Sequence, residues 1–150
     1  MNAPELRLSY KPDDEWVGEL TAVVKSGAFS GKGSAWFDRK SLKESFVLAM
    51  RAFPLSAGDP PVIEGGFWSK EETLEQCHLR VAVRPYDRRG KLLVQVDLAS
   101  PSRTTPDSDQ QQLVTARFLT EYSALDKFAS SLEQVLDGKS ESAVLPGTEE

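Results

Sequence analysis

Sulfur and imidazole chemistry are scarce in this chain of 150 residues, which contains one cysteine, Cys77, and one histidine, His78. A single cysteine excludes a disulfide bond within the chain and any zinc site built from several cysteines. A single histidine excludes sites that need two or three imidazole ligands. We therefore expect no cofactor and no metal centre, and we expect a non-catalytic protein more readily than an enzyme.

The chain also lacks long apolar runs and an excess of positive charge. No stretch approaches the roughly 18 consecutive apolar residues that a membrane span needs, and residues 1–10 lack the pattern of a secretion signal. The 18 Lys and Arg residues are outnumbered by 23 Asp and Glu residues, so the net charge is −5. Because nucleic acids and anionic membranes are bound through basic surfaces, neither is an expected partner. We expect a cytoplasmic protein.

Alternation of apolar and polar residues predicts the strands. The clearest pair is 76–84 and 91–98, separated by the turn-like segment PYDRRG. Pairing their apolar faces places Val83 opposite Leu92 and Cys77 opposite Leu98, with His78 opposite Asp97 on the other face. The segment SGAFSGKGS is typical of a turn. Further strands are expected at Leu6–Tyr10, Val17–Lys25, Ala35–Phe37, Val62–Ile63, Phe67–Trp68 and Leu113–Thr120.

Two amphipathic helices are expected. The first is Arg39–Ala52, with Asp38 as its N-cap and an apolar stripe of Leu42, Phe46, Ala49 and Phe53. The second is Ala124–Asp137, which Ser123 would cap and Gly138 would end. Its apolar stripe consists of Leu125, Phe128, Leu132, Val135 and Leu136.

Together these elements predict an α+β fold: a single, mostly antiparallel sheet of about six or seven strands with two amphipathic helices packed on one face. The length fits one domain spanning residues 1–150. We expect an ordered core at about residues 5–138 and a polar tail at residues 139–150. Trp16, Trp36, Phe67 and Trp68 lie near turns and strand ends and are expected to plug the core, with exposure as the alternative for Trp68, which follows Gly65–Gly66 closely.

Few motifs point to chemistry. The run GAFSGKGS lacks the spacing of a phosphate-binding loop. His78 and Asp97 would form a dyad in which the carboxylate orients the imidazole, but Cys77 would lie on the opposite face and no G-x-S-x-G motif accompanies them. An exposed ion pair explains the same two residues. The candidate binding face is the polar side of the sheet, with His78, Arg80, Gln95, Asp97, Thr115 and Arg117. The polar loop Ser100–Gln111 is a second candidate, because long loops often carry function.

The order of the elements resembles the small bacterial WapI-type immunity proteins. The resemblance rests on an acidic turn that ends in Trp16, on Trp36–Phe37, and on a helix with Leu42, Phe46 and Phe53, followed by a final helix that starts near Tyr122. It covers residues 6–138 and includes no functional motif. It implies a non-enzymatic protein that binds and neutralises a toxin of its own producer.

Three functions remain open. The first is a non-catalytic cytoplasmic protein that binds a macromolecular partner, which for an immunity protein is a toxin. The second is a small-ligand-binding protein or enzyme that uses a cleft near His78, Arg80 and Asp97. The third is a structural subunit that associates with its own copies through the sheet.

Overall fold

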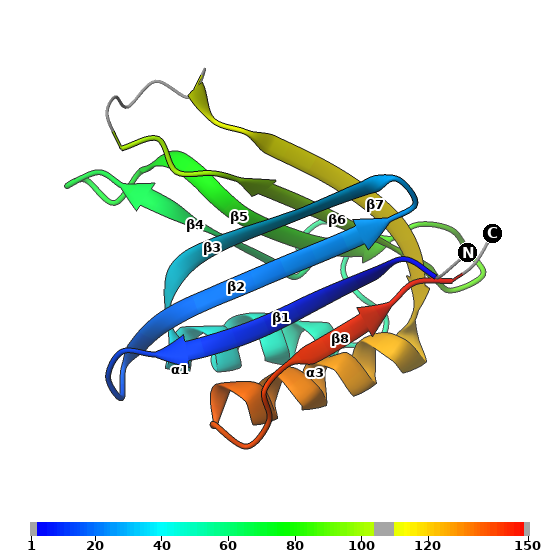
Figure 1. The fold of residues 1–150 in the computed structure, drawn as a ribbon. Helices are drawn as coiled ribbons and strands as arrows, with labels where there is room; N and C mark the ends of the chain where they lie inside the picture. Colours follow the sequence, from blue (N-terminus) through cyan, green and yellow to red (C-terminus); the bar gives the residue numbers. More distant parts are fainter. Residues whose placement is uncertain (1–2, 104–109, 149–150) are drawn as a thin grey trace.

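The structure is a computed structural model that describes residues 3–103 and 110–148. Within these residues, eight strands form two separate four-stranded antiparallel sheets (Figure 1). The prediction of a single sheet of six or seven strands is therefore wrong. Sheet A contains, in spatial order, β3 (Phe29–Asp38), β2 (Val17–Ser26), β1 (Glu5–Pro12) and β8 (Ala143–Pro146). Sheet B contains β4 (Val62–Trp68), β5 (Leu74–Pro85), β6 (Lys91–Ala99) and β7 (Leu113–Glu121).

The two sheets pack face to face, and β3 crosses all four strands of sheet B. Two strand glycines permit this close approach. A Cβ at Gly33 would lie 2.7 Å from the carbonyl oxygen of His78, and a Cβ at Gly31 would overlap the side chain of Val114. The turn predicted at SGAFSGKGS is correspondingly shorter: Gly27, at φ +62°, lies in the turn, and the next strand already starts at Phe29.

The first helical segment, Arg39–Met50, leads from sheet A to sheet B. It consists of α1 (Arg39–Ser41), a π-helical stretch η1 (Leu42–Val47) and α2 (Leu48–Met50). The predicted N-cap is confirmed, because Asp38 Oδ1 accepts a hydrogen bond of 2.9 Å from the Ser41 amide. The wider π turns change the buried stripe to Leu42, Phe46, Val47 and Met50. The predicted stripe member Phe53 lies beyond the helix and is 79% exposed.

The second helix, α3 (Tyr122–Leu136), closes the core beside the first (Figure 1). The five predicted stripe residues are all buried, together with Ala129. The predicted cap at Ser123 is wrong: the helix begins at Tyr122, and Glu121 is its N-cap without a side-chain hydrogen bond. At the other end Gly138, at φ +77°, allows the chain to leave the helix, as predicted.

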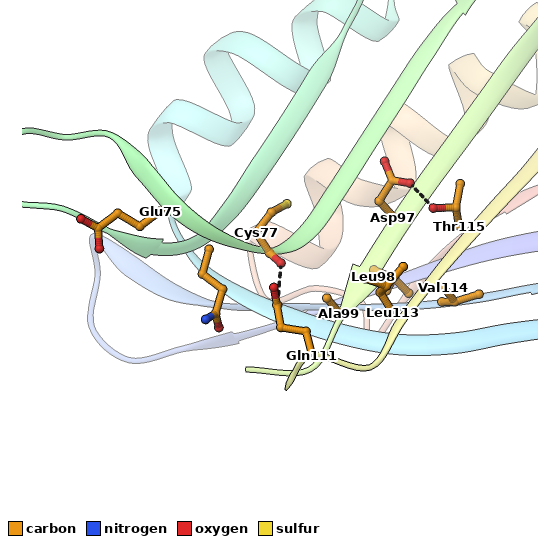
Figure 2. A pocket seen from close by; sticks show the side chains of 10 residues that line it. Glu75, Cys77, Asp97, Leu98, Ala99, Gln111, Leu113, Val114 and Thr115 are labelled. Atoms are coloured by element: carbon orange, nitrogen blue, oxygen red, sulfur yellow. Dashed lines mark hydrogen bonds between the residues drawn. The ribbon is translucent and has the colours of Figure 1, made fainter. Parts of the chain in front are cut away.

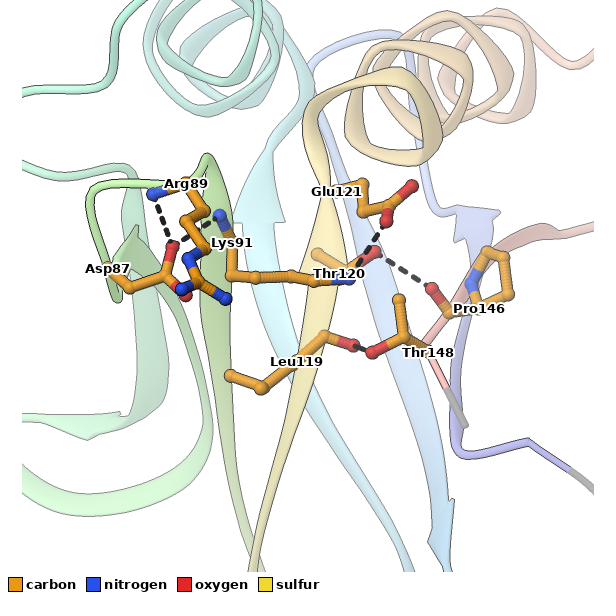
Figure 3. A network of polar contacts seen from close by, with 8 residues as sticks. All are labelled: Asp87, Arg89, Lys91, Leu119, Thr120, Glu121, Pro146 and Thr148. Carbon is orange, nitrogen blue, oxygen red and sulfur yellow. Dashed lines mark hydrogen bonds and ion pairs between the residues drawn. The ribbon is translucent and has the colours of Figure 1, made fainter. Parts of the chain in front are cut away.

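The segment expected to be a polar tail contains the last strand. β8 pairs with β1, and its residues Ala143 and Leu145 are buried. The same segment also joins the two sheets, because Thr120 Oγ1 donates to the Pro146 carbonyl oxygen (2.9 Å) and Thr148 Oγ1 donates to the Leu119 carbonyl oxygen (3.4 Å) (Figure 3). The Thr148 amide donates to the same Leu119 oxygen (2.8 Å). Residues 143–148 thus complete sheet A and fasten it to β7.

The three tryptophans do not plug the core. Trp16, Trp36 and Trp68 are each at least half exposed. The core is instead mostly aliphatic, with Phe46, Phe118 and Phe128 as its buried aromatic residues, and it is formed by the inward residues of both sheets and by the two helical stripes. No helix in the described part of the chain is long and apolar enough to cross a membrane.

Candidate functional site: the outer face of sheet B

The β5–β6 hairpin has a different register from the predicted one. Val83 pairs with Val94, and Leu79 pairs with Leu98, a shift of two residues. A shift by two preserves the faces, so Leu79, Val81 and Val83 still point inward and are buried. The turn explains the shift, because Asp87 Oδ1 accepts hydrogen bonds from the amides of Arg89 and Lys91 (Figure 3), and the hairpin closes at Tyr86 and Lys91 with a shorter loop than the predicted 85–90.

A β-bulge in β5 reverses the predicted orientation of Cys77 and His78. Gly65 pairs with Leu79, whereas the next residue, Gly66, pairs with Cys77, so His78 is the additional residue of β5. His78 and Leu79 are consequently both buried, and Cys77 lies on the outer face. The predicted pairing of His78 with Asp97 is wrong, because Arg80 lies opposite Asp97.

Five of the six predicted site residues share the outer face of sheet B, the side turned away from the core. Glu64, Arg80, Asp97 and Thr115 form a row across the four strands. Arg80 forms an ion pair of 3.5 Å with Glu64, and Thr115 Oγ1 donates a 2.7 Å hydrogen bond to Asp97. In the neighbouring row, Arg117 Nε donates to Gln95 Oε1 at 3.3 Å. These cross-strand bonds hold the polar side chains in defined positions.

Apolar side chains border these polar rows on both sides. On one side Leu93 lies opposite Leu119, and both are half-buried. On the other side Ala99 lies opposite Leu113, whose side chain is 72% exposed. The outer face therefore combines arginines, hydrogen-bonding groups and exposed apolar groups on rigid strands.

His78, the sixth predicted residue, lies on the inner side in a small polar cluster. The Ser102 amide donates to Gln76 Oε1 (2.9 Å), and Gln76 Nε2 donates to the Ser102 carbonyl oxygen (3.3 Å). Since Gln76 Oε1 is thereby an acceptor, His78 Nε2, 2.6 Å away, acts as the donor. The ring edge also packs against Phe67, with 4.5 Å between the ring centroids.

Burial explains the protonation state of this imidazole. Desolvation lowers the pKa of His78 below its ordinary value, and the positive charge of Arg103 adds to the lowering. His78 is therefore neutral at pH 7. The cluster anchors the start of the Ser100–Gln111 loop to β5, while residues 104–109 of that loop lie outside the described residues.

A pocket of about 310 Å³ opens at one end of the outer face (Figure 2). Gln111 shapes it, because its Nε2 donates to the carbonyl oxygens of Cys77 (3.2 Å) and Ser100 (2.9 Å), at the end where β5 and β6 are no longer paired. Partial burial is the main cause that raises the pKa of the Cys77 thiol, and the Glu64 and Asp97 carboxylates add to it. The thiol is thus protonated at neutral pH and a poor nucleophile.

Neither this pocket nor the contribution of Gln111 was predicted from the sequence. Gln76 and His78 occupy regular polar positions of the alternation in β5, so the signal for the bulge was Gly65–Gly66 on the partner strand. The cleft expected near His78, Arg80 and Asp97 does not form, because His78 is on the other side of the sheet. Among residues 3–103 and 110–148, no cluster of three or more His, Cys, Asp or Glu side chains is placed to hold a metal ion.

Comparisons of this chain with known protein families, with curated proteins and with solved structures find no match.

Proposed function

We propose that this chain is a non-catalytic protein that acts by binding a protein partner through the outer face of sheet B. The observation that carries the proposal is the composition of that face: two polar rows held by cross-strand bonds, bordered by Leu93 and Leu119 on one side and by Leu113 on the other. Arginine and apolar anchors on rigid strands are typical of protein interfaces.

The placement of the reactive side chains favours binding over catalysis. Cys77 and His78 are adjacent in sequence but point to opposite sides of β5, so the imidazole cannot activate the thiol. The His78 ring nitrogen that faces Gln76 is occupied by a hydrogen bond. A cytoplasmic location belongs to the same proposal, and cell fractionation tests it.

Capture of the partner from cells of the source organism tests the face directly. The variant combines Leu113→Ser with Arg117→Ser, two exposed residues of β7. The matched control combines Trp36→Ser with Lys11→Ser, which removes one exposed aromatic side chain and one cation from the outer face of sheet A. We expect a protein that the wild type and the control retain and that the β7 variant loses.

Equal recovery of the protein by both double variants would overturn the proposal. A second copy of this chain on the outer face would instead produce a dimer in light scattering that the β7 variant dissociates. The proposal includes a toxin as the partner, as the sequence resemblance implies. It predicts that the captured partner stops growth when expressed alone and that co-expression of this chain restores growth.

A further inference from the structure

The pocket beside the polar rows has an apolar lining and carboxylates at its margin. Cys77, Ala99, Leu113 and Val114 contribute to the lining, and Glu75 and Asp97 are its two acidic residues (Figure 2). The described residues that line it include no Lys and no Arg. The pocket is therefore negatively charged, and no cation of its own lining neutralises it.

The bonding of Asp97 shows that its charge is oriented but not neutralised by an ion pair. Its carboxylate accepts hydrogen bonds from two uncharged groups, Thr115 Oγ1 at 2.7 Å and Gln95 Nε2 at 3.2 Å. The nearest cation across the strands, Arg80, forms its ion pair with Glu64 instead. Two carboxylate oxygens offer about four acceptor sites, so Asp97 retains capacity for a further donor.

The second carboxylate of the pocket is also without a cation. Glu75 is exposed, and it forms no ion pair with the described residues. Glu75 lies at the opposite end of the pocket from Asp97 (Figure 2), so a ligand beside Asp97 meets one carboxylate and an apolar surface within a negatively charged pocket. This combination suits a side chain with an apolar stem and a cationic head.

We propose that the pocket receives an arginine side chain of the partner protein. This inference rests on the proposed function and specifies the chemistry of the partner. The methylene groups of arginine would cover Leu113 and Ala99, while the guanidinium donates hydrogen bonds to Asp97, and Glu75 at the opposite end of the pocket adds to the negative potential. An apolar side chain fits less well, because it would bury the Asp97 carboxylate without a compensating charge. Arginine is preferred to lysine, since its planar head has more donors and a weaker hydration shell.

A small probe tests the pocket without knowledge of the partner. Nα-acetyl-arginine methylamide is titrated into the ¹⁵N-labelled full chain, and its neutral isostere, the citrulline compound, is the control ligand. We expect saturable shifts of the amide signals of Asp97, Ala99, Leu113 and Thr115 with the arginine probe. The citrulline probe should bind at least about tenfold more weakly, since about 1.4 kcal/mol corresponds to a factor of ten.

Two variants separate the pocket from general electrostatic attraction. Asp97→Asn should weaken binding of the arginine probe about tenfold, whereas Asp59→Asn removes one exposed carboxylate away from the pocket and should change nothing. If Asp97→Asn fails to fold, Glu75→Gln at the exposed opposite end of the pocket is the second variant, and it should weaken binding of the arginine probe by a smaller factor because it lowers only the negative potential. Equal binding of the two probes, or an unchanged affinity in the pocket variants, would refute the inference.

Partner capture with Asp97→Asn distinguishes this inference from the proposed function. Loss of the partner from Asp97→Asn together with binding of the arginine probe supports both. A partner that Asp97→Asn retains but the β7 variant loses would refute the arginine pocket and leave the proposed function intact. Binding of the arginine probe without any partner captured through this face would refute the proposed function and leave a guanidinium-binding pocket.

Discussion

Replacing Gly33 by alanine tests the crossing of β3 over sheet B. The new Cβ would lie 2.7 Å from the carbonyl oxygen of His78 and 3.1 Å from Leu98 Cβ. The first neighbour is backbone, so it cannot rotate away, and the two sheets must separate locally. Insertion of a methyl group into a tightly packed site costs about 1–3 kcal/mol. We therefore expect the free energy of unfolding to fall by about that amount.

A matched glycine supplies the control. Gly58 has no heavy atom within 4 Å of its ideal Cβ position, and neither Gly58 nor Gly33 has a positive φ. Gly58→Ala should stabilise the protein by about 0.4–1 kcal/mol, because alanine restricts the unfolded chain. The same unfolded-state gain acts at Gly33, so the difference between the two variants isolates the steric cost.

Urea unfolding followed by circular dichroism measures both variants. At constant m value, the midpoint should move to lower urea for Gly33→Ala and to equal or higher urea for Gly58→Ala. In thermal scans each kcal/mol corresponds to about 2–4 °C in Tm for a domain of this size. If Gly33→Ala proves as stable as Gly58→Ala, then β3 does not pass this close to β5 and β6, and the packing of the two sheets described above is wrong.

Two further predictions concern the core and the buried imidazole. Leu132→Ala should destabilise the protein by about 2–5 kcal/mol in urea unfolding, because this α3 side chain is fully buried, and a loss below about 0.5 kcal/mol would contradict the docking of α3. The lowered pKa of His78 means that the unfolded chain binds the proton more tightly, so stability should fall as the pH drops below about 6.5. Urea titrations between pH 8 and pH 5 should therefore show the wild type losing stability relative to His78→Gln, and a difference that is independent of pH would contradict the burial of His78.

Local sequence patterns predicted the individual helices and strands better than they predicted which residues pair between strands. The stripe of α3 was correct because a period of 3.6 residues, sustained over several turns, has one buried solution. Alternation in strands says which side chains share a face, but it is unchanged by a shift of two residues. The register of β5 and β6 therefore depended on the turn at Asp87, whose side-chain hydrogen bonds the pattern did not reveal.

The number of sheets was the larger error, and it has a physical cause. A strand with one apolar face can be covered by a helix or by another sheet, and the sequence pattern is the same in both cases. The glycines of β3 carried the missing information, because glycines inside a strand often mark close approach of another backbone. Because Gly31 and Gly33 were interpreted as turn residues, the contact between the sheets was not predicted.

Part of the candidate site was predictable from the alternation of polar and apolar residues in the strands. Arg80, Gln95, Asp97, Thr115 and Arg117 share a face because alternation holds in the regular parts of β5, β6 and β7. His78 does not, because one additional residue in β5 reverses the alternation on one side of it. The pocket depends on the position of Gln111, which belongs to a segment without a periodic pattern.

The pairing of β8 with β1 has a consequence for biosynthesis. The edge of β1 stays unpaired until residues 143–146 have left the ribosome, although β1 is made long before them. In that interval sheet A presents an open strand edge, which is a template for association with other chains. Contacts of such large sequence separation also slow folding, since the loop must close before the pairing stabilises it. Completion of sheet A thus waits for residues 143–146, and until they pair with β1 the open edge makes the nascent chain prone to association.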